Sequence, residues 1–405
     1  MSDLESRTLS DLVIETKDGD WGQDAPSEGF TPYHVIRGAD FPAVRRGDVS
    51  TVPVRYLSEH TVARRKLQPG DIIIETAGGT RDRPTGRTLF INESLLARID
   101  GPATCASFAR FLRVDARKAD PRFIYWYLQN LHASGGTWEH QVQHTGVARF
   151  QYTRFASTHE IPLPPYQKQS AVAEVLFALD DKIAVNDRIA QACGQMLSLQ
   201  LDQWMQSNPG AVRECPLSSL AEFVNGRAFT KDATGTGRMV IRIAEINSGP
   251  GSSTVYNDIE VPDVHLARPG DVLFAWSGSL AVARWSRAEG IINQHIFKVI
   301  PSHGIPAWLV FEMIDAKLAM FKGIAADKAT TMGHIQRRHL DEPVEVPKQD
   351  GIAHLDAALG PLWERALSAE QESLELAELR DSLLPRLMSG EIRVRDAEKV
   401  VEDVT

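Results

Sequence analysis

The centre of the chain carries an apolar pattern that favours one long helix. After the prolines of "IPLPPY" near Pro164, apolar residues follow at alternating steps of four and three, an average period of 3.5 residues that is typical of a coiled-coil seam. A helix over residues 170–205 would be about 54 Å long, at roughly 1.5 Å per residue. The pattern therefore predicts a rod, with a core helix inside one globular domain as the alternative. The seam positions are Val172, Leu176, Leu179, Ile183, Asn186, Ala190, Cys193 and Leu197.

A second seam lies near the C-terminus. We expect the two helices to pair antiparallel, with a globular domain at each end. Asn186 sits on the first seam, where a buried amide fixes register at a cost in stability; a solvated edge position is the alternative. The second seam consists of Leu355, Leu359, Leu362, Ala366, Ala369, Ser373 and Leu376, continued by Leu383 and Leu387.

The two halves of the chain repeat each other weakly. "LQPGDIIIETAGGT" (67–80) matches "ARPGDVLFAWSGSL" (267–280): each is a Pro-Gly-Asp turn, a buried-looking strand and a loop of small residues. A proline-bearing segment before each long helix also recurs. The turn-to-proline distance is 95 residues from Pro69 to Pro164 but 78 from Pro269 to Pro347. Two copies indicate a pseudo-symmetric protein, since a solenoid needs more repeats.

The net charge of −9 argues at first against a nucleic-acid partner, but its distribution changes that interpretation. Residues 1–160 hold 20 basic and 20 acidic residues, whereas residues 348–405 hold 7 and 13. The larger pieces are near neutral and can present basic faces. The cysteines show no CxxC spacing, the N-terminus lacks a signal-peptide pattern, and the apolar runs are too short to cross a bilayer. We expect a cytoplasmic protein without a membrane partner.

Catalytic motifs are missing from the sequence. "LPPY" (163–166) differs from the Asn/Asp-Pro-Pro-Tyr signature of amino-methyltransferases at the position that must accept a hydrogen bond, because leucine cannot accept one. There is no GxxxxGK[ST] phosphate loop. His140 and His144 alone are too few ligands for zinc. We therefore predict no catalytic residue, no metal ligand and no cofactor in this chain.

Polar loops remain as candidates for reading an extended partner. Arginines among glycines can bind phosphate or guanine, and asparagine or glutamine can pair with adenine. Each cluster alone is typical of a solvated loop, but the clusters recur at matching places in both halves. The candidate residues for binding this partner, which the resemblance described below identifies as DNA, are Arg81, Arg83, Arg87, Thr145, Gln151 and Arg154 in the first half, and Ser277, Asn293, Gln294, Gln336, Arg337 and Arg338 in the second.

The chain resembles a known family, the specificity subunit of type I restriction-modification enzymes. "IPLPPYQKQSAVAEVLFALDDKIAVNDRI" (161–189) is similar to the central spacer of that family, and "LRDSLLPRLMSGEIRV" (379–394) resembles the end of its second spacer and the tail. The order of these motifs is right. The two pieces between them vary freely in the family, as the two halves do here.

The resemblance implies an α+β fold: two similar α/β target-recognition domains separated by two long antiparallel coiled-coil helices, related by a pseudo-twofold. The expected parts are residues 1–160 (first recognition domain), 161–213 (central spacer), 214–347 (second recognition domain), and 348–405 (distal spacer and tail).

The resemblance also implies a role and partners. The chain would be a non-catalytic subunit that reads a bipartite double-stranded DNA site. Two methyltransferase subunits would dock on it, carry S-adenosylmethionine and methylate adenine N6, and a translocating endonuclease subunit would join them. The alternatives are a structural adaptor of a related phage-defence complex and a self-sufficient methyltransferase-endonuclease, against which "LPPY" argues.

Overall fold

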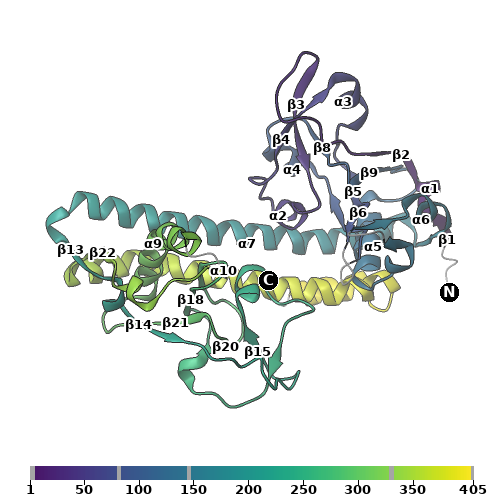
Figure 1. Cartoon of the computed structure of the whole chain (residues 1–405). Coiled ribbons are helices and arrows are strands. Elements are labelled where there is room, and N and C mark those ends of the chain that lie inside the picture. The colour runs from purple at the N-terminus through teal and green to yellow at the C-terminus, as the bar shows by residue number, and fades with distance from the viewer. Residues whose placement is uncertain (1–4, 80–83, 144–146, 328–332, 403–405) are drawn as a thin grey trace. The chain divides into compact units, whose positions relative to one another are not determined.

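The computed structural model describes residues 5–79, 84–143, 147–327 and 333–402. These fall into two compact units: unit 1 is Met1–Ala184 with Glu375–Thr405, and unit 2 is Val185–Leu374. Two long helices, α7 (Tyr166–Ser207) and α10 (Gln349–Ser389), each have one part in unit 1 and the other in unit 2; Figure 1 shows them in teal and yellow. The four-part division expected from the sequence stays a prediction.

Unit 1 is built on a four-stranded antiparallel sheet of order β2-β9-β5-β7. Beside it lie a three-stranded sheet, β4-β3-β8, with a parallel β3–β8 pair, and a smaller sheet, β10-β11-β6. The first and last strands, β1 and β12, pair antiparallel, with Glu5 opposite Leu163. The strands are β1 (Glu5–Thr8), β2 (Val13–Asp18), β3 (Phe30–Ile36), β4 (Val54–Ser58), β5 (Asp71–Glu75), β6 (Ala77–Gly79), β7 (Thr88–Phe90), β8 (Ala103–Cys105), β9 (Ala109–Val114), β10 (Gln141–Gln143), β11 (Ala148–Phe150) and β12 (Glu160–Leu163).

Short helices cover the sheets of unit 1. In α5, the Asp120 side chain caps the first turn by accepting from the Arg122 N–H, and Pro121 fits the first helical position because its missing N–H would have no partner there. Its buried face carries Phe123 and Trp126. The helices are α1 (Leu9–Leu12), α2 (Phe41–Arg45), α3 (Glu59–Arg65), α4 (Glu93–Ile99), α5 (Pro121–Ala133), η1 (Trp138–His140), α6 (Tyr152–Thr158) and α11 (Val394–Glu402).

Unit 2 has a four-stranded antiparallel sheet of order β14-β21-β18-β19 and a second sheet of order β16-β15-β20-β17. Its outer strands β13 and β22 pair antiparallel, and β15–β20 is parallel. The elements are η2 (Pro209–Ala211), β13 (Val212–Pro216), η3 (Leu217–Ser219), β14 (Ala221–Asn225), β15 (Arg238–Ile241), α8 (Ile243–Ser248), β16 (Tyr256–Asn257), η4 (Asp263–His265), β17 (Leu266–Ala267), β18 (Val272–Ala275), β19 (Ala281–Arg284), β20 (Gly290–Ile292), β21 (Ile296–Pro301), α9 (Ala307–Asp327), η5 (Arg337–Asp341) and β22 (Pro343–Pro347).

The two units share the order of the main four-stranded sheet, β2-β9-β5-β7 in unit 1 and β14-β21-β18-β19 in unit 2. Each also has one parallel strand pair, β3–β8 and β15–β20. In each Pro-Gly-Asp turn the glycine has positive φ, +91° at Gly70 and +92° at Gly270, a conformation that favours glycine. Each unit also has an ion pair between an arginine and the acidic residue three positions later. In unit 1, Arg37 Nη2 lies 2.7 Å from the carboxylate of Asp40, and in unit 2, Arg242 Nη2 lies 2.5 Å from the carboxylate of Glu245. The weak sequence repeat thus corresponds to a repeated fold.

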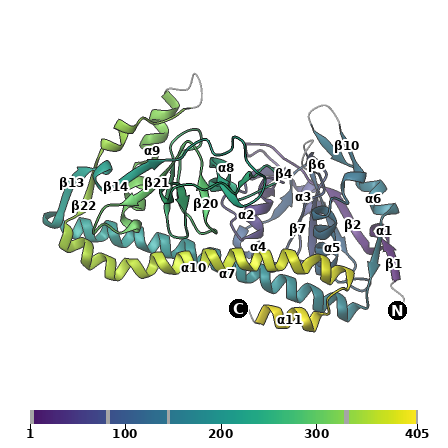
Figure 2. The same cartoon turned by 90° about the horizontal axis from the view of Figure 1, so that it is seen from below.

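The long helices pack antiparallel within each unit. In unit 1, Arg380 pairs with Asp180 at 2.5 Å, and a buried core joins α7 and α10. In unit 2, the Ser373 hydroxyl donates to Asp187 at 3.1 Å, whereas Trp204, further along α7, contacts Gly351, earlier in α10. Figures 1 and 2 both show the two helices side by side. The seam leucines Leu176, Leu179 and Leu359 and Ile183 are buried, and Leu362 is partly buried.

Asn186 lies on this seam with a fully buried side chain, so the solvated-edge alternative is wrong. Neither its Oδ1 nor its Nδ2 has a hydrogen-bond partner among the described residues. A buried amide without partners costs about 1–3 kcal/mol. The helix pair therefore keeps a polar group at a position where an apolar side chain would be more stabilising.

A partly buried carboxyl in unit 2 predicts a pH dependence of stability. Glu312 on α9 accepts a hydrogen bond from the Ser198 hydroxyl of α7 at 2.6 Å. Burial raises the pKa of Glu312, and the nearby carboxylates Asp315 and Asp202 add to this, so that the pKa is about 7 despite the opposing hydrogen bond from Ser198. The pKa of Glu312 is higher in the folded than in the unfolded protein, so protonated Glu312 favours the folded state. This contribution to the free energy of unfolding is fully present below the unfolded pKa and is lost as the pH rises through about 7.

Replacing Glu312 with glutamine should therefore remove this loss. We expect Glu312→Gln to match the parent protein near pH 5 and to be more stable by about 2 kcal/mol near pH 8. Denaturant unfolding of both proteins across this pH range measures the difference. If the free energy of unfolding changed with pH in the same way in both proteins, Glu312 would not be the group responsible.

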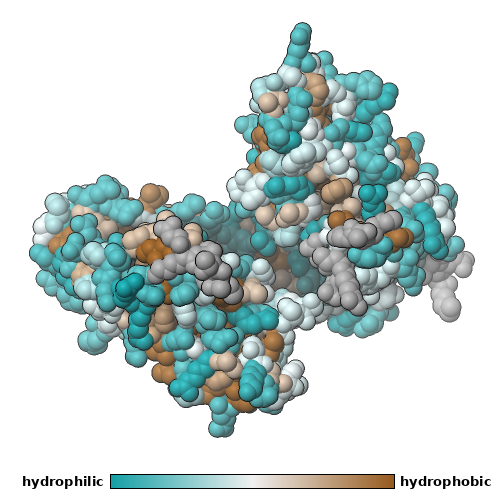
Figure 3. Space-filling model, in the orientation of Figure 1, coloured by the Kyte–Doolittle hydropathy of each residue, from teal (hydrophilic) through white to brown (hydrophobic). Residues whose placement is uncertain are grey.

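The surface visible in Figure 3 is mainly hydrophilic, with hydrophobic residues in small separate groups. Within the described ranges, no helix combines the length and the apolar character needed to cross a bilayer.

Candidate nucleic-acid interface

A groove of about 470 Å³ in unit 1 brings together two of the predicted residues, Gln151 and Arg154. It lies where β2 and β9 meet the start of α6. Arg110 from β9 also lines it, although the sequence analysis did not single it out. Two guanidinium groups and an amide on one groove can donate hydrogen bonds to phosphate oxygens and base edges.

Local backbone contacts position these side chains. The N–H of Gln151 donates to the His140 carbonyl at 2.7 Å and places Gln151 just before the first turn of α6, which leaves Arg154 exposed. The Arg110 guanidinium donates twice to Asp18, at 2.9 and 2.8 Å, and lies 4.5 Å from the ring centre of Tyr152. Arg110 is thus held by a carboxylate and an aromatic ring, with part of its surface still exposed.

Unit 2 places Gln336 at the equivalent position. The residue before each glutamine pairs in the same way: the Phe150 N–H donates to Thr76 O at 2.9 Å, and the Ile335 N–H donates to Trp276 O at 3.1 Å. Gln336 then precedes η5 as Gln151 precedes α6. The next two residues of unit 2, Arg337 and Arg338, are exposed, and Arg337 Nη2 donates to Phe223 O at 3.3 Å. The two predicted glutamines are therefore structural counterparts.

Arg87 is held by an acid. Its Nε and Nη2 donate to the two carboxylate oxygens of buried Glu75 at 2.9 and 2.6 Å. Gly38 and Gly78 leave room for this carboxylate, because a Cβ at either would lie 2.7 Å from Glu75 Oε1. The pair lines an open cavity of about 850 Å³. The predicted residues Arg81, Arg83 and Thr145 lie outside the described residues.

Two predicted residues of unit 2 are buried. Ser277 pairs through its backbone with His334, and the Asn293 side-chain oxygen accepts from the Phe229 N–H at 3.1 Å. Both residues join neighbouring loops. Gln294 is exposed, with its backbone N–H donating to Arg227 O at 2.9 Å. The side chain of Gln294 is therefore open to solvent or to a ligand.

The corresponding turn of unit 1 exposes an aromatic ring. The Ala109 N–H donates to Ala106 O at 2.9 Å, and Phe108 within this turn is 61% exposed. Thr76 N donates to Phe108 O as Trp276 N donates to His295 O, so Phe108 corresponds to His295. The sequence analysis missed Phe108 because it searched for polar groups. An exposed ring on a turn can contact a thymine methyl or stack on a base.

The described residues contain no group of three or more His, Cys, Asp or Glu side chains arranged to hold a metal ion. What the interface offers is hydrogen-bond donors, acceptors and rings on short loops, held by rigid sheets. This arrangement suits recognition of a surface.

Comparison with known proteins identifies the fold. No protein-family model and no curated protein matches the sequence. The crystal structure of a type I restriction-modification system S subunit from M. genitalium is similar, with a TM-score of 0.55 at 15% identity over 96% of this chain and 97% of that chain. The HsdS subunit from Thermoanaerobacter tengcongensis scores 0.36 at 15% identity, over 97% of this chain and 98% of that one. A chain from a structural study of complex assembly and conformational transition of the type I R-M system scores 0.40 at 16%, over 97% and 99%. The first likeness shows a shared fold, whereas the other two scores are too low to support an inference.

Proposed function

We propose that this chain is the DNA sequence-specificity subunit of a type I restriction-modification complex and reads a bipartite DNA site. The observation that carries the proposal is the fold shared with the M. genitalium S subunit over nearly the whole of both chains. The family motifs in residues 161–189 and 379–394 agree with it. In this proposal the chain recognises DNA and leaves catalysis to partner subunits.

The repeated fold fits a split target. Each unit presents a glutamine at the same structural position, Gln151 in unit 1 and Gln336 in unit 2, next to exposed basic side chains. Two similar readers on one chain suit two half-sites. In the proposed arrangement, α7 and α10 form a pseudo-twofold coiled coil that fixes the distance between the recognition domains. Because the helices are stiff, the gap between half-sites would then be constant.

The proposed partners follow from the same reading. Two methyltransferase subunits would dock on the chain and supply S-adenosylmethionine, and an endonuclease subunit would join them. The near-neutral recognition pieces suit a subunit that shares phosphate contacts with its partners, since each phosphate contact steepens the salt dependence of binding. We therefore expect a shallower salt dependence of DNA affinity for the chain alone than for the complex.

The experiment co-expresses the chain with its neighbouring methyltransferase gene and maps the modified bases by methylation-sensitive sequencing. A split motif with a fixed gap would support the proposal. The absence of any modified motif would favour the structural adaptor, and methylation by the chain alone would favour the self-sufficient enzyme.

Single glutamine substitutions should each relax one half-site. We expect Gln151→Ala to lower discrimination at a base of the first half-site by about 10- to 100-fold, because a bidentate amide–base pair contributes about 1–3 kcal/mol of discrimination. Gln336→Ala should do the same in the second half-site. The motif mapped for each variant measures the effect.

The matched control is Gln203→Ala, which removes an exposed amide from α7. Its motif should equal that of the parent. If Gln151→Ala and Gln336→Ala relaxed the same half-site, or if neither changed the motif, these residues would not be the readers.

A further inference from the structure

The open cavity of about 850 Å³ in unit 1 has two exposed aromatic side chains in its lining, Trp21 and Phe108. Its volume lies within the range of about 300–1,000 Å³ that is usual for small-molecule sites. Trp21 is 37% exposed and Phe108 is 61% exposed. Because rings at an open cavity lose contact with water when a ligand covers them, these two favour binding of a flat, apolar surface.

Local contacts fix the backbone that carries these two rings. The Arg55 guanidinium lies 4.4 Å from the centre of the Trp21 ring, and its Nε donates to the Trp21 carbonyl at 3.0 Å. The Phe108 carbonyl accepts from the N–H groups of Thr76 and Ala77 at 2.8 and 3.2 Å. A ligand that stacks on the rings therefore does not have to order these loops first, which lowers the entropy cost of binding.

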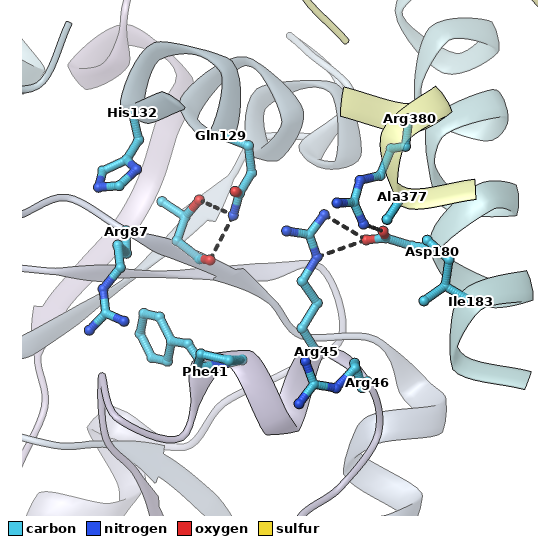
Figure 4. A pocket seen from close by; sticks show the side chains of 12 residues that line it. Phe41, Arg45, Arg46, Arg87, Gln129, His132, Asp180, Ile183, Ala377 and Arg380 are labelled. Carbon is cyan, nitrogen blue, oxygen red and sulfur yellow. Dashed lines mark hydrogen bonds and ion pairs between the residues drawn. The ribbon is translucent and has the colours of Figure 1, made fainter. Parts of the chain in front are cut away.

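The charged side chains in the lining are already paired. Arg87 donates to both carboxylate oxygens of Glu75, and Arg37 donates to both carboxylate oxygens of Asp40. The Arg87 guanidinium also lies 5.8 Å from the centre of the Phe41 ring, and Figure 4 shows these two side chains next to each other. Because the charges are matched within the protein, the cavity suits a neutral ligand.

Unit 2 has apolar side chains at the equivalent place. Counted from the Pro-Gly-Asp turns, Glu75 corresponds to Ala275, and counted from the arginine–acid pairs, Gly38 corresponds to Ile243. Ala275 is fully buried, and Ile243 packs against the core that contains it. A buried ion pair is often no more stabilising than packed apolar residues. Since the same fold forms in unit 2 without this ion pair, stability alone does not account for the charged lining in unit 1.

We propose that this cavity binds a nucleobase. The flat faces of a base can stack on Trp21 and Phe108. The edge of a base carries donors next to acceptors, and the lining offers both kinds of group in the Arg87–Glu75 pair and in the exposed Ser107 hydroxyl. A paired carboxylate oxygen keeps a second acceptor position, and a paired guanidinium keeps further donors. A hydrocarbon ring would leave these polar groups without partners, so a base suits the cavity better.

The base could belong to a free nucleoside or could be turned out of bound DNA. The cavity adjoins the groove of the candidate interface: Thr76 lines the groove, and its neighbours Glu75 and Ala77 line the cavity. Likewise, Arg110 of the groove follows Phe108 of the cavity by two residues. DNA in the groove would therefore bring its bases close to the cavity. The site is proposed independently of sequence reading; its DNA source alone rests on the proposed function.

The test measures binding of adenosine, guanosine, cytidine and thymidine to the full chain by equilibrium dialysis. We expect saturable binding of at least one of them, and we expect Phe108→Ala to weaken it by about tenfold, which is typical for the loss of one stacking ring. Phe108 is exposed, so this variant should fold normally. The control is Trp138→Ala, because Trp138 is a 40% exposed ring of the same unit that does not line the cavity.

Equal affinity of the parent and Phe108→Ala for the nucleoside would overturn the proposal, as would no saturable binding of any of the four up to roughly 10 mM. Indole supplies a second check, because it is nearly as large as a purine but has a single hydrogen-bond donor. It should bind more weakly than the nucleoside. Equal binding of indole would mean that the cavity takes any flat ring, and the assignment to a nucleobase would be wrong.

A fluorescent base, 2-aminopurine, identifies the source, since its emission rises when it leaves the base stack. It is placed in turn at each position of the DNA site mapped for the methyltransferase complex. A rise at one position that Phe108→Ala lowers points to a base of the DNA, whereas no such position points to a free nucleoside. Both outcomes support the site. The dialysis needs no DNA, so its failure is separate from a failure to find a methylated motif.

Discussion

Replacing Leu179 with aspartate is expected to unfold most of unit 1. Leu179 is 1% exposed and lies in the core that joins α7 to α10, together with Leu376 and Leu383. The change removes a buried apolar side chain, which costs about 2–5 kcal/mol, and it places a carboxylate in a core of apolar side chains. A total loss above about 4 kcal/mol is a large share of the 5–15 kcal/mol that typically stabilises a domain.

The measurement is denaturant unfolding, with hydrogen exchange to locate the loss. Leu199→Asp is the matched control: the same substitution on the same helix, at a leucine that is 67% exposed. It should change the free energy of unfolding by no more than about 0.5 kcal/mol. If Leu179→Asp were as well tolerated as Leu199→Asp, α7 would not pack along this seam.

Gly226→Ala is expected to destroy the sheet packing of unit 2 and to leave unit 1 folded. A Cβ at Gly226 would lie 2.1 Å from Asn293 O and 2.4 Å from Ile292 O, and backbone atoms cannot rotate away as a side chain can. We expect a destabilisation of more than about 3 kcal/mol, which is typical of severe overpacking. Hydrogen exchange should show lost protection in β14 and β21 and retained protection in β2 and β9.

Gly19→Ala should have the mirror effect in unit 1, because its Cβ would lie 2.0 Å from Cys105 O. Gly194→Ala is the control: it lies in α7 with no atom within 4 Å of the added methyl. Alanine in a helix should stabilise by about 0.5–1 kcal/mol. Loss of protection in both units after either single substitution would show that the two cores do not fold separately.

The helices and the repeat could be predicted from the sequence because they depend on periodicity. The expected helix over 170–205 corresponds to α7 at Tyr166–Ser207. It could be found because a helix that buries one seam against another helix needs apolar residues at an average period of 3.5. Likewise, the Pro-Gly-Asp turns marked equivalent strands. These features are local in sequence, so one chain is enough to find them.

The side chains of the interface could not be predicted in the same way. Arg87 and Glu75 are twelve residues apart, and strand pairing between β5 and β7 brings them together. Asn293 is buried because its side chain bonds to the Phe229 N–H, and these two residues are 64 positions apart in the sequence. Both contacts depend on how segments distant in sequence pair in the fold, which composition and short motifs do not specify. Phe108 was missed for a different reason: an apolar residue next to a strand looks like core until the turn shows it at the surface.

The outer strand pairs have a consequence for how such a chain can change. β1 runs beside β12, and β13 runs beside β22, so the segment before each long helix ends next to the place where it began. Residues added or lost between those neighbouring strands need not shift the helix that follows. This pairing of the first and last strands explains how the first half tolerates a longer interval than the second. It also lets the residues between the paired strands be lengthened, shortened or replaced without shifting the long helix that follows.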